Sequence, residues 1–250
     1  MPDKINISSV IGLSPNEAVE YFKKKGYTIT RTWKDLESAQ HARTFTVAGV
    51  LKIEILKTIR EMLDKALQEG ITLEQFKKEL EPKLRDAGWW DTTEDGKVQG
   101  SYNRLLTIYR TNLQSAYMAG RYRQDMENTQ YRPYWKYVAV LDSKTRPEHA
   151  ALNNKVFMWN DPVWDTVYPP NGFNCRCMVV ALSKDDMKRE GLEVTNGNNV
   201  NFEPDEGFDS NAGLETDIGA LLTRKISELP DDMQDEISNA IAGSEYMGVV

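Results

Sequence analysis

The spacing of apolar residues changes near residue 130, from the three-to-four-residue period of helices to the two-residue period of strands. Over residues 35–68 apolar side chains recur every three or four positions, which predicts one helical stripe that ends at Gly70. Over residues 135–141 they recur at every second position, which predicts a strand running into Asp142. We therefore predict an α+β fold: a helical N-terminal region, then a small mixed α+β module with a short sheet, then short C-terminal helices.

Capping residues predict where other helices of the first part begin and end. The sequence SPNEAVEYFKKKG has Pro15 at the first helical position and Gly26 just past the end of a short helix. Thr72 begins a capping box, and the helix that follows is expected to be interrupted near Pro82. A further long helix is expected over residues 101–128.

The second part of the chain has the pattern of short strands joined by turns. Residues 155–157 and 175–182 predict two strands, and the Pro- and Gly-containing residues 168–174 between them predict a turn. Ser183 then begins a brief helix that Gly191 ends.

These patterns divide the chain into three parts. Residues 1–130 are assigned to the helical N-terminal region and residues 131–192 to the α+β module. Residues 193–250 form an acidic C-terminal segment, with short helices expected at about 214–229 and 231–242.

Charge is distributed unevenly along the chain. Residues 183–250 contain 5 Lys and Arg against 16 Asp and Glu, whereas residues 1–182 contain 26 against 22. An acidic end repels the phosphate backbone of nucleic acid, so a general DNA-coating role is disfavoured and docking to protein partners is favoured. No apolar run approaches the roughly 20 residues that a membrane span requires, so we expect no membrane association.

Cys175 and Cys177 are the strongest candidates for metal ligands. Residues two apart in a strand point to the same face, roughly 6.5 to 7 Å from each other, a poor arrangement for a disulfide. They are therefore expected to be reduced thiols or metal ligands. His149 lies in a polar turn after the predicted strand and can approach them. Two thiolates, one imidazole and the carboxylate of Asp142 would form a tetrahedral zinc site.

The same residues also allow a structural interpretation. In it, the cysteines are small core residues and His149 forms local hydrogen bonds. A catalytic cysteine with His149 as its base is disfavoured, because a buried apolar strand gives a nucleophile little access. The carboxylates of Asp142, Asp161 and Asp165 are best interpreted as turn caps, so we predict no catalytic residue.

The ordered motifs of residues 142–182 resemble the C-terminal module of phage Mu protein F-like minor head proteins, in the phage head morphogenesis family. The segment reads DSKTRPEHAALNNKVFMWNDPVWDTVYPPNGFNCRCMVVAL. It contains an aspartate before a basic TRPEH turn, a KVF strand, a DPVW segment, a PPNG turn and a closing NCRC. Similar segments on both sides, among them PNEAVEYFKKKGY and PDEGFDSNAG, extend the resemblance to about residues 11–213.

The resemblance also bears on the metal site. Some similar proteins carry Cys-x-x-Cys where this chain has Arg146 and His149, together with the same closing C-R-C. This implies a metal cluster in which His149 replaces one thiolate, with Asp142 or water as the fourth ligand. The structural alternative is that Arg146 and Arg176 hold Asp142 in a salt bridge. The residues of the structural motif are Asp142, Arg146, Pro169, Pro170, Gly172, Asn174 and Arg176.

The resemblance implies a minor head protein, without enzymatic activity, that associates with the portal protein and with capsid or scaffold proteins. It would be assembled in the cytoplasm of the bacterial host and reside in the virion, in the head interior or at the portal vertex. A role in DNA packaging or delivery, with weak DNA contact, is also implied. Two alternatives belong to other classes. A metal-dependent enzyme or toxin-like transferase predicts zinc with an exchangeable water, and a DNA-binding ejection protein predicts strongly salt-dependent DNA affinity.

Overall fold

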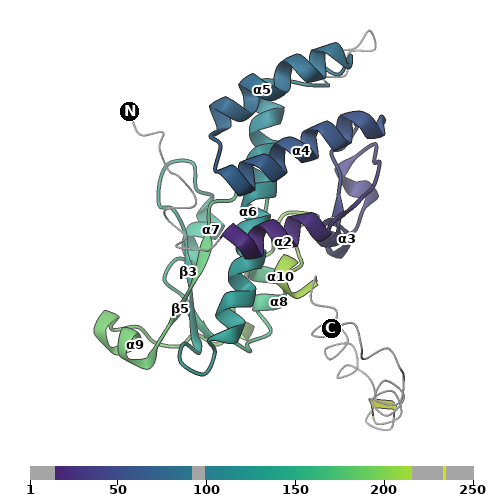
Figure 1. The fold of residues 1–250 in the computed structure, drawn as a ribbon. Helices are drawn as coiled ribbons and strands as arrows, with labels where there is room; N and C mark the ends of the chain where they lie inside the picture. Colours follow the sequence, from purple (N-terminus) through teal and green to yellow (C-terminus); the bar gives the residue numbers. More distant parts are fainter. Residues whose placement is uncertain (1–14, 92–98, 216–232, 235–250) are drawn as a thin grey trace.

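The computed structural model describes residues 15–91, 99–215 and 233–234 and confirms the α+β fold (Figure 1). The helices are α2 (Pro15–Lys24), α3 (Ser38–Arg43), α4 (Ile53–Glu69), α5 (Leu73–Asp86), α6 (Tyr102–Glu127), α7 (Pro147–Ala151), α8 (Trp164–Val167), α9 (Lys184–Glu190) and α10 (Ala212–Glu215), with 3-10 helices at Trp33–Asp35 and Gly197–Asn199. The strands are β1 (Gly26–Tyr27), β2 (Thr44–Phe45), β3 (Tyr134–Val138), β4 (Val156–Met158) and β5 (Met178–Leu182).

The long helix α6 joins the two halves of the fold. Ser101 caps its first turn, because the hydroxyl accepts a hydrogen bond from the backbone N–H of Arg104. Leu105 and Ile108 are buried in the N-terminal core, whereas Met118 belongs to the core of the module. Figure 1 shows α6 extending from α4 and α5 to the sheet that contains β3 and β5. One helix therefore contributes side chains to both cores.

The N-terminal core forms where α2, α4 and α5 pack against α6. Arg60 of α4 is buried within it, and its guanidinium donates hydrogen bonds to the backbone carbonyls of Phe22 at 2.7 Å and Lys25 at 2.5 Å. The last carbonyls of a helix have no partner inside that helix. The buried guanidinium of Arg60 supplies those partners at the end of α2.

The helix predicted over residues 35–68 is wrong in its first half. α4 begins only at Ile53, and the chain before it forms α3 and then β2, which pairs in parallel with β1. Val47 and Val50 are buried as the pattern indicated, but they lie beside a turn at which Gly49 has a φ of 75°. A turn can also bury residues three apart, so periodicity alone did not locate the start of the helix.

The interruption expected near Pro82 is also wrong. α5 begins with the predicted capping box at Thr72 and continues through Pro82 to Asp86. Its buried residues Phe76, Leu80 and Leu84 lie four positions apart, on one face of the helix. This stripe extends past the exposed Pro82, so tertiary packing outweighs the backbone hydrogen bond that proline removes.

The module contains a three-stranded antiparallel sheet in the order β4-β3-β5. In the central strand, Trp135 is paired with Phe157 of β4 and Ala181 of β5. Its ring is fully buried and contacts Tyr122 of α6 and Trp164 of α8. The alternation predicted for this strand thus places one face of the sheet against α6.

Two strand boundaries differ from the prediction. β3 ends at Val138 rather than at Asp142, because the backbone N–H of Ala139 donates to the side chain of Asn153 instead of to a neighbouring strand. β5 begins at Met178, so both cysteines lie in the loop before it. The common orientation of the cysteines is therefore set by that loop.

The helices predicted at 214–229 and 231–242 lie outside the described residues, apart from residues 214–215 in α10 and residues 233–234. The division of the chain at residues 130 and 192 stays a prediction. Within the described ranges, no helix combines the length and apolar composition that crossing a membrane needs.

Candidate metal centre

Three buried side chains of the module, those of His149, Cys175 and Cys177, lie together. Nδ1 of His149 is 3.8 Å from Sγ of Cys175 and 3.5 Å from Sγ of Cys177. The ligand atoms of all three residues lie within 4.8 Å of one another. Both cysteines are free thiols, as expected. The structure thus brings together three of the four predicted zinc ligands.

These residues come from two separate segments. His149 lies on α7, which begins at Pro147 in the position that proline favours. The cysteines follow the PPNG turn, which contains a cis peptide bond between Pro169 and Pro170. Asn174, immediately before Cys175, is left-handed with a φ of 57°. The turn directs the chain back toward α7.

A buried asparagine holds the PPNG turn. The side-chain amide of Asn171 donates hydrogen bonds to Oη of Tyr137 at 3.0 Å and to the backbone carbonyl of Val167 at 2.9 Å. Asn171 has no exposed surface, and Tyr137 belongs to the central strand β3. The turn is therefore fixed to the sheet immediately before the cysteines.

Arg146 connects the cluster to the segment that follows the module. Its Nε donates a hydrogen bond to Nε2 of His149 at 3.1 Å, and its Nη1 donates to Oδ2 of Asp205 at 2.7 Å. Gly172 makes room for this ion pair, since a Cβ at Gly172 would overlap the Asp205 carboxylate and lie 2.5 Å from Nη2 of Arg146. The resemblance placed Arg146 and Gly172 in one motif, and this contact is the physical relation between them.

The hydrogen bond from Arg146 also determines where His149 carries its proton. Nε2 accepts from a guanidinium that cannot itself accept, so the neutral imidazole is protonated at Nδ1. Nδ1 therefore donates toward the two sulfur atoms. Hydrogen bonds from Cys177 and His149 hold the pKa of the Cys175 thiol well below its usual range. The interaction with Cys175 and burial raise the pKa of the Cys177 thiol.

The two sulfur–nitrogen distances fit zinc, but the surroundings of His149 fit it less well. Zn–S and Zn–N bonds in a tetrahedral site place sulfur about 3.6 Å from nitrogen. The observed separations of 3.8 and 3.5 Å agree with that value. However, a ligating imidazole normally donates its other N–H to an acceptor, whereas Nε2 of His149 faces the N–H of Arg146. Metal binding through Nδ1 would require Arg146 to release Nε2.

Asp142, the fourth predicted ligand, is not part of the cluster. Its carboxylate accepts two hydrogen bonds from Arg176, at 2.7 and 2.6 Å, and one from the backbone N–H of Lys144 at 2.9 Å. These bonds hold the pKa of the Asp142 carboxyl below its usual range, with the Arg176 contact as the largest cause. The predicted salt bridge therefore forms with Arg176, whereas Arg146 pairs with Asp205.

A surface cavity of about 130 Å³ adjoins the cluster. Its lining includes His149, both cysteines and the cationic residues Lys144 and Arg146. Because Asp142 is bound elsewhere, the fourth ligand of a tetrahedral zinc ion would have to be a water molecule in this cavity.

The residue types alone did not reveal three members of the site, which are Asp205, Asn171 and Phe202. Asp205 lies 59 residues from Arg146, and Asn171 lies 34 residues from Tyr137. The ring of Phe202 also contacts the imidazole of His149, with centroids 5.3 Å apart. Asp205 belongs to the PDEG segment and Asn171 to the PPNG segment. The resemblance of these segments to the family was the one feature of the sequence that could have identified the two residues.

Fold and site together define an α+β protein in which a helical region is joined to a small module closed around a buried Cys/His cluster. The family model described as Phage Mu protein F like protein matches residues 57–180. A protein of Escherichia phage Mu, named "Putative capsid assembly protein F", is 46% identical over 224 residues, 85% of this chain and 51% of the phage protein. The Mu-like prophage FluMu F protein of Haemophilus influenzae is 41% identical over 208 residues, 82% of this chain and 49% of that protein.

The chain belongs to the phage Mu protein F-like family, as its motifs indicated. It spans about half the length of these two curated relatives. No solved structure matches it significantly.

Proposed function

We propose that this chain is a phage head protein that acts in capsid assembly, without a catalytic step. The observation that carries the proposal is the 46% identity, over most of the chain, to a phage Mu protein named for capsid assembly. In its finer form, the proposal is a minor head protein that binds the portal protein and capsid or scaffold proteins, resides in the virion and contributes to DNA packaging or delivery.

Exposed apolar side chains among the described residues support the proposal that the chain binds other proteins. Ile29, two residues after β1, and Leu51, two residues before α4, are 46% and 59% exposed. The acidic balance of residues 183–250 disfavours contact with DNA along that part of the chain. Both features suit an adaptor between proteins better than a protein that coats DNA.

The test is to remove the gene from the phage or prophage and to count heads, packaged DNA and infectious particles after induction. Defective heads or unpackaged DNA, restored by the wild-type gene in trans, would support the proposal. A normal yield of infectious particles would refute it. The portal role is tested separately by asking whether portal protein co-purifies with the tagged chain from induced cells. Capture of DNA alone, released by moderate salt, would favour the ejection-protein alternative.

We also propose that the Cys/His cluster binds zinc as a structural brace. Sγ of Cys175, Sγ of Cys177 and Nδ1 of His149 would hold the ion, which would link α7 to the loop before β5. The agreement of the sulfur–nitrogen distances with a tetrahedral site supports this proposal. The hydrogen bond between Arg146 and His149 opposes zinc binding, so the proposal can be tested by removing the Arg146 side chain.

A further inference from the structure

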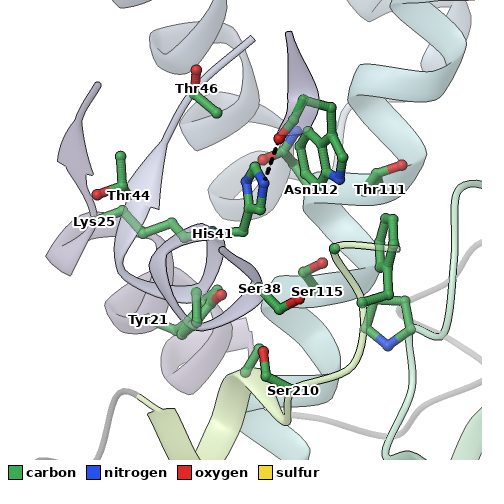
Figure 2. Close-up of a pocket in the computed structure, with 16 residues that line it drawn as sticks. Tyr21, Lys25, Ser38, His41, Thr44, Thr46, Thr111, Asn112, Ser115 and Ser210 are labelled. Carbon is green, nitrogen blue, oxygen red and sulfur yellow. Dashed lines mark hydrogen bonds between the residues drawn. The ribbon is translucent and has the colours of Figure 1, made fainter. Parts of the chain in front are cut away.

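A second polar site lies far from the cysteines in sequence, where α2, α3 and α6 meet residues 207–212. Here a cavity with a free volume of about 50 Å³ is lined by side chains from all of these segments (Figure 2). One water molecule needs roughly 10 to 15 Å³ by this measure. The cavity therefore has room for a few waters or for one small oxyanion.

The cavity has one cation and no acid among the described residues that line it. Lys25 is 8% exposed, and its ammonium lies 5.0 Å from the centroid of the Tyr21 ring. Within the described ranges the ammonium has no ion pair or hydrogen bond, and the nearby charge that acts on it is another cation, Arg60. A buried ammonium without a counter-ion is costly, and proteins usually pair such a group.

Arg60 is a second buried cation in this core, and its guanidinium does have partners. Its guanidinium donates to backbone carbonyls of α2 and lies 3.7 Å from the carboxylate of Asp64. The ammonium of Lys25, which follows the last residue of the same helix, has neither kind of partner among the described residues. It can therefore pair with a bound anion.

Some polar groups around the cavity also lack partners. The hydroxyls of Tyr21 and Thr111 and the indole N–H of Trp33 are buried, and none has a hydrogen-bond partner among the described residues. All three residues line the cavity, as does Ser115 one helical turn beyond Thr111 on α6. Figure 2 shows Lys25, Tyr21, Thr111 and Ser115 around a common space. Donors that surround one cation are the groups that bind a carboxylate or phosphate oxygen.

We propose that this cavity, the Lys25 site, binds a small oxyanion of the carboxylate or phosphate class. The ammonium of Lys25 neutralises the anion, and the hydroxyls of Tyr21, Thr111 and Ser115 donate hydrogen bonds to its oxygens. Because residues 207–212 form one wall, the anion also ties the segment after the module to the N-terminal helices.

The protonation of Lys25 gives the site a predictable pH dependence. Burial, and secondarily Arg60, lower the pKa of Lys25 to about 7. Burial likewise lowers the pKa of His41, on α3, to about 4, so that imidazole is neutral above pH 5. Tyr21 on α2 stays protonated, because burial raises its pKa, and the α6 residues that line the cavity do not titrate. Lys25 is thus the group whose charge changes between pH 6 and 8.5.

The test compares thermal unfolding of the full chain with added acetate, phosphate or chloride at matched ionic strength, at pH 6 and pH 8.5. We expect a rise in Tm of about 3 °C with 50 mM of an occupying oxyanion at pH 6 and no specific effect of chloride. The comparison with pH 8.5 uses acetate, whose charge is the same at both pH values, and a smaller rise is expected there. A larger effect of acetate identifies a carboxylate ligand, and a larger effect of phosphate identifies a phosphate ligand.

Two variants separate occupancy from general salt effects. Lys25→Met should abolish the oxyanion-dependent rise, whereas Lys24→Met, which removes an exposed charge from the adjacent position, should retain it. If Lys25→Met does not fold, Ser115→Ala should still reduce the rise. An equal response of wild type and Lys25→Met, or of wild type and Ser115→Ala, would overturn the proposal. So would the absence of any oxyanion-specific response in the wild type.

Discussion

Nε of Arg146 donates a hydrogen bond to Nε2 of His149 at 3.1 Å, on the side of the ring opposite the two cysteine sulfurs. This contact places the imidazole proton on Nδ1, where a zinc ion would have to bind. In the proposed zinc brace, Arg146 would therefore have to release Nε2 before Nδ1 could bind the ion.

Removing that arginine side chain should strengthen zinc binding. In Arg146→Met, Nε2 can carry the proton and Nδ1 can present its lone pair, so zinc affinity should rise by about 10-fold or more. Competition with a chromogenic chelator measures the change. Lys184→Met, which removes an exposed charge on α9 that is not part of the cavity beside the cluster, should leave the affinity unchanged. Equal affinity in wild type and Arg146→Met would show that the contact does not oppose the metal.

Zinc content itself depends on the cysteines. Protein purified without chelator should contain close to one zinc per chain, and Cys175→Ser and Cys177→Ser should each lose it. Elemental analysis beside a thiol titration measures both quantities. Stoichiometric zinc in Cys177→Ser, or none in the wild type and in Arg146→Met, would end the proposal of a zinc brace.

A side chain at Gly172 should weaken the module. A Cβ there would overlap the carboxylate of Asp205, and the φ of 156° is one that other residues rarely adopt. Gly172→Ala should therefore lower the free energy of unfolding by about 2 to 4 kcal/mol. Urea denaturation measures the change. Gly26→Ala, where a Cβ meets nothing within 4 Å, should change it by less than about 1 kcal/mol. Equal stability of the two variants would contradict the steric argument.

Replacing the proline inside α5 should stabilise the protein. Pro82 is exposed and lies beyond the first turn of the helix, where proline costs about 3 kcal/mol relative to alanine. Pro82→Ala should raise the free energy of unfolding by about 1 to 3 kcal/mol, less any gain that proline provides by restricting the unfolded chain. Chemical denaturation followed by circular dichroism provides the measurement. Lys78→Ala, an exposed control in the same helix, should have little effect. A loss of stability in Pro82→Ala would mean that the ring makes contacts worth more than the missing hydrogen bond.

The stability of the folded chain should depend on Asp125. Burial raises the pKa of this α6 carboxyl to about 6, although Arg121 and Arg132 oppose the shift. Its Oδ2 accepts no hydrogen bond from the part of the chain that the structure describes. Because the folded pKa exceeds the unfolded value of 3.8, the folded state binds more protons between pH 4 and 6. The free energy of unfolding should therefore decrease as the pH rises through that range.

Asp125→Asn should remove this dependence. At pH 7.5 the variant should be more stable than the wild type by about 1 to 3 kcal/mol, and near pH 4 the two should differ little. Denaturation at both pH values measures the difference, with the exposed Glu127→Gln as the matched control. A variant that is less stable at pH 7.5 would show that the charge of Asp125 is needed by its arginine partners.

Local sequence predicted the helices whose ends are set by neighbouring residues. The capping boxes at Thr72 and Ser183 and the left-handed glycines Gly70 and Gly191 form as expected, because each needs hydrogen bonds that reach only a few positions along the chain. The segment before Ile53 was predicted wrongly. Its shape depends on pairing between β1 and β2, which are about 18 residues apart, and on the turn at Gly49.

The cysteines and His149 could be identified as candidate ligands from the sequence because few residue types have that chemistry. Their partners could not. Asp142 pairs with Arg176, 34 positions away, and Arg146 pairs with Asp205, 59 positions away. An ion pair of this kind depends on which oppositely charged groups the folded chain brings within a few ångströms, and the sequence contains many equivalent candidates.

The sequence by itself thus determined the fold class, the family and the chemical identity of the cluster. Only the tertiary structure decided that Arg146 faces Nε2 of His149, that Asp142 is bound elsewhere and that Lys25 is buried beside unpaired hydroxyls. The physical reason is the distance along the chain between the groups that interact. Helix caps and turns are stabilised by contacts within a few residues, whereas the protonation and partners of a buried group are set by atoms that folding brings together from distant segments.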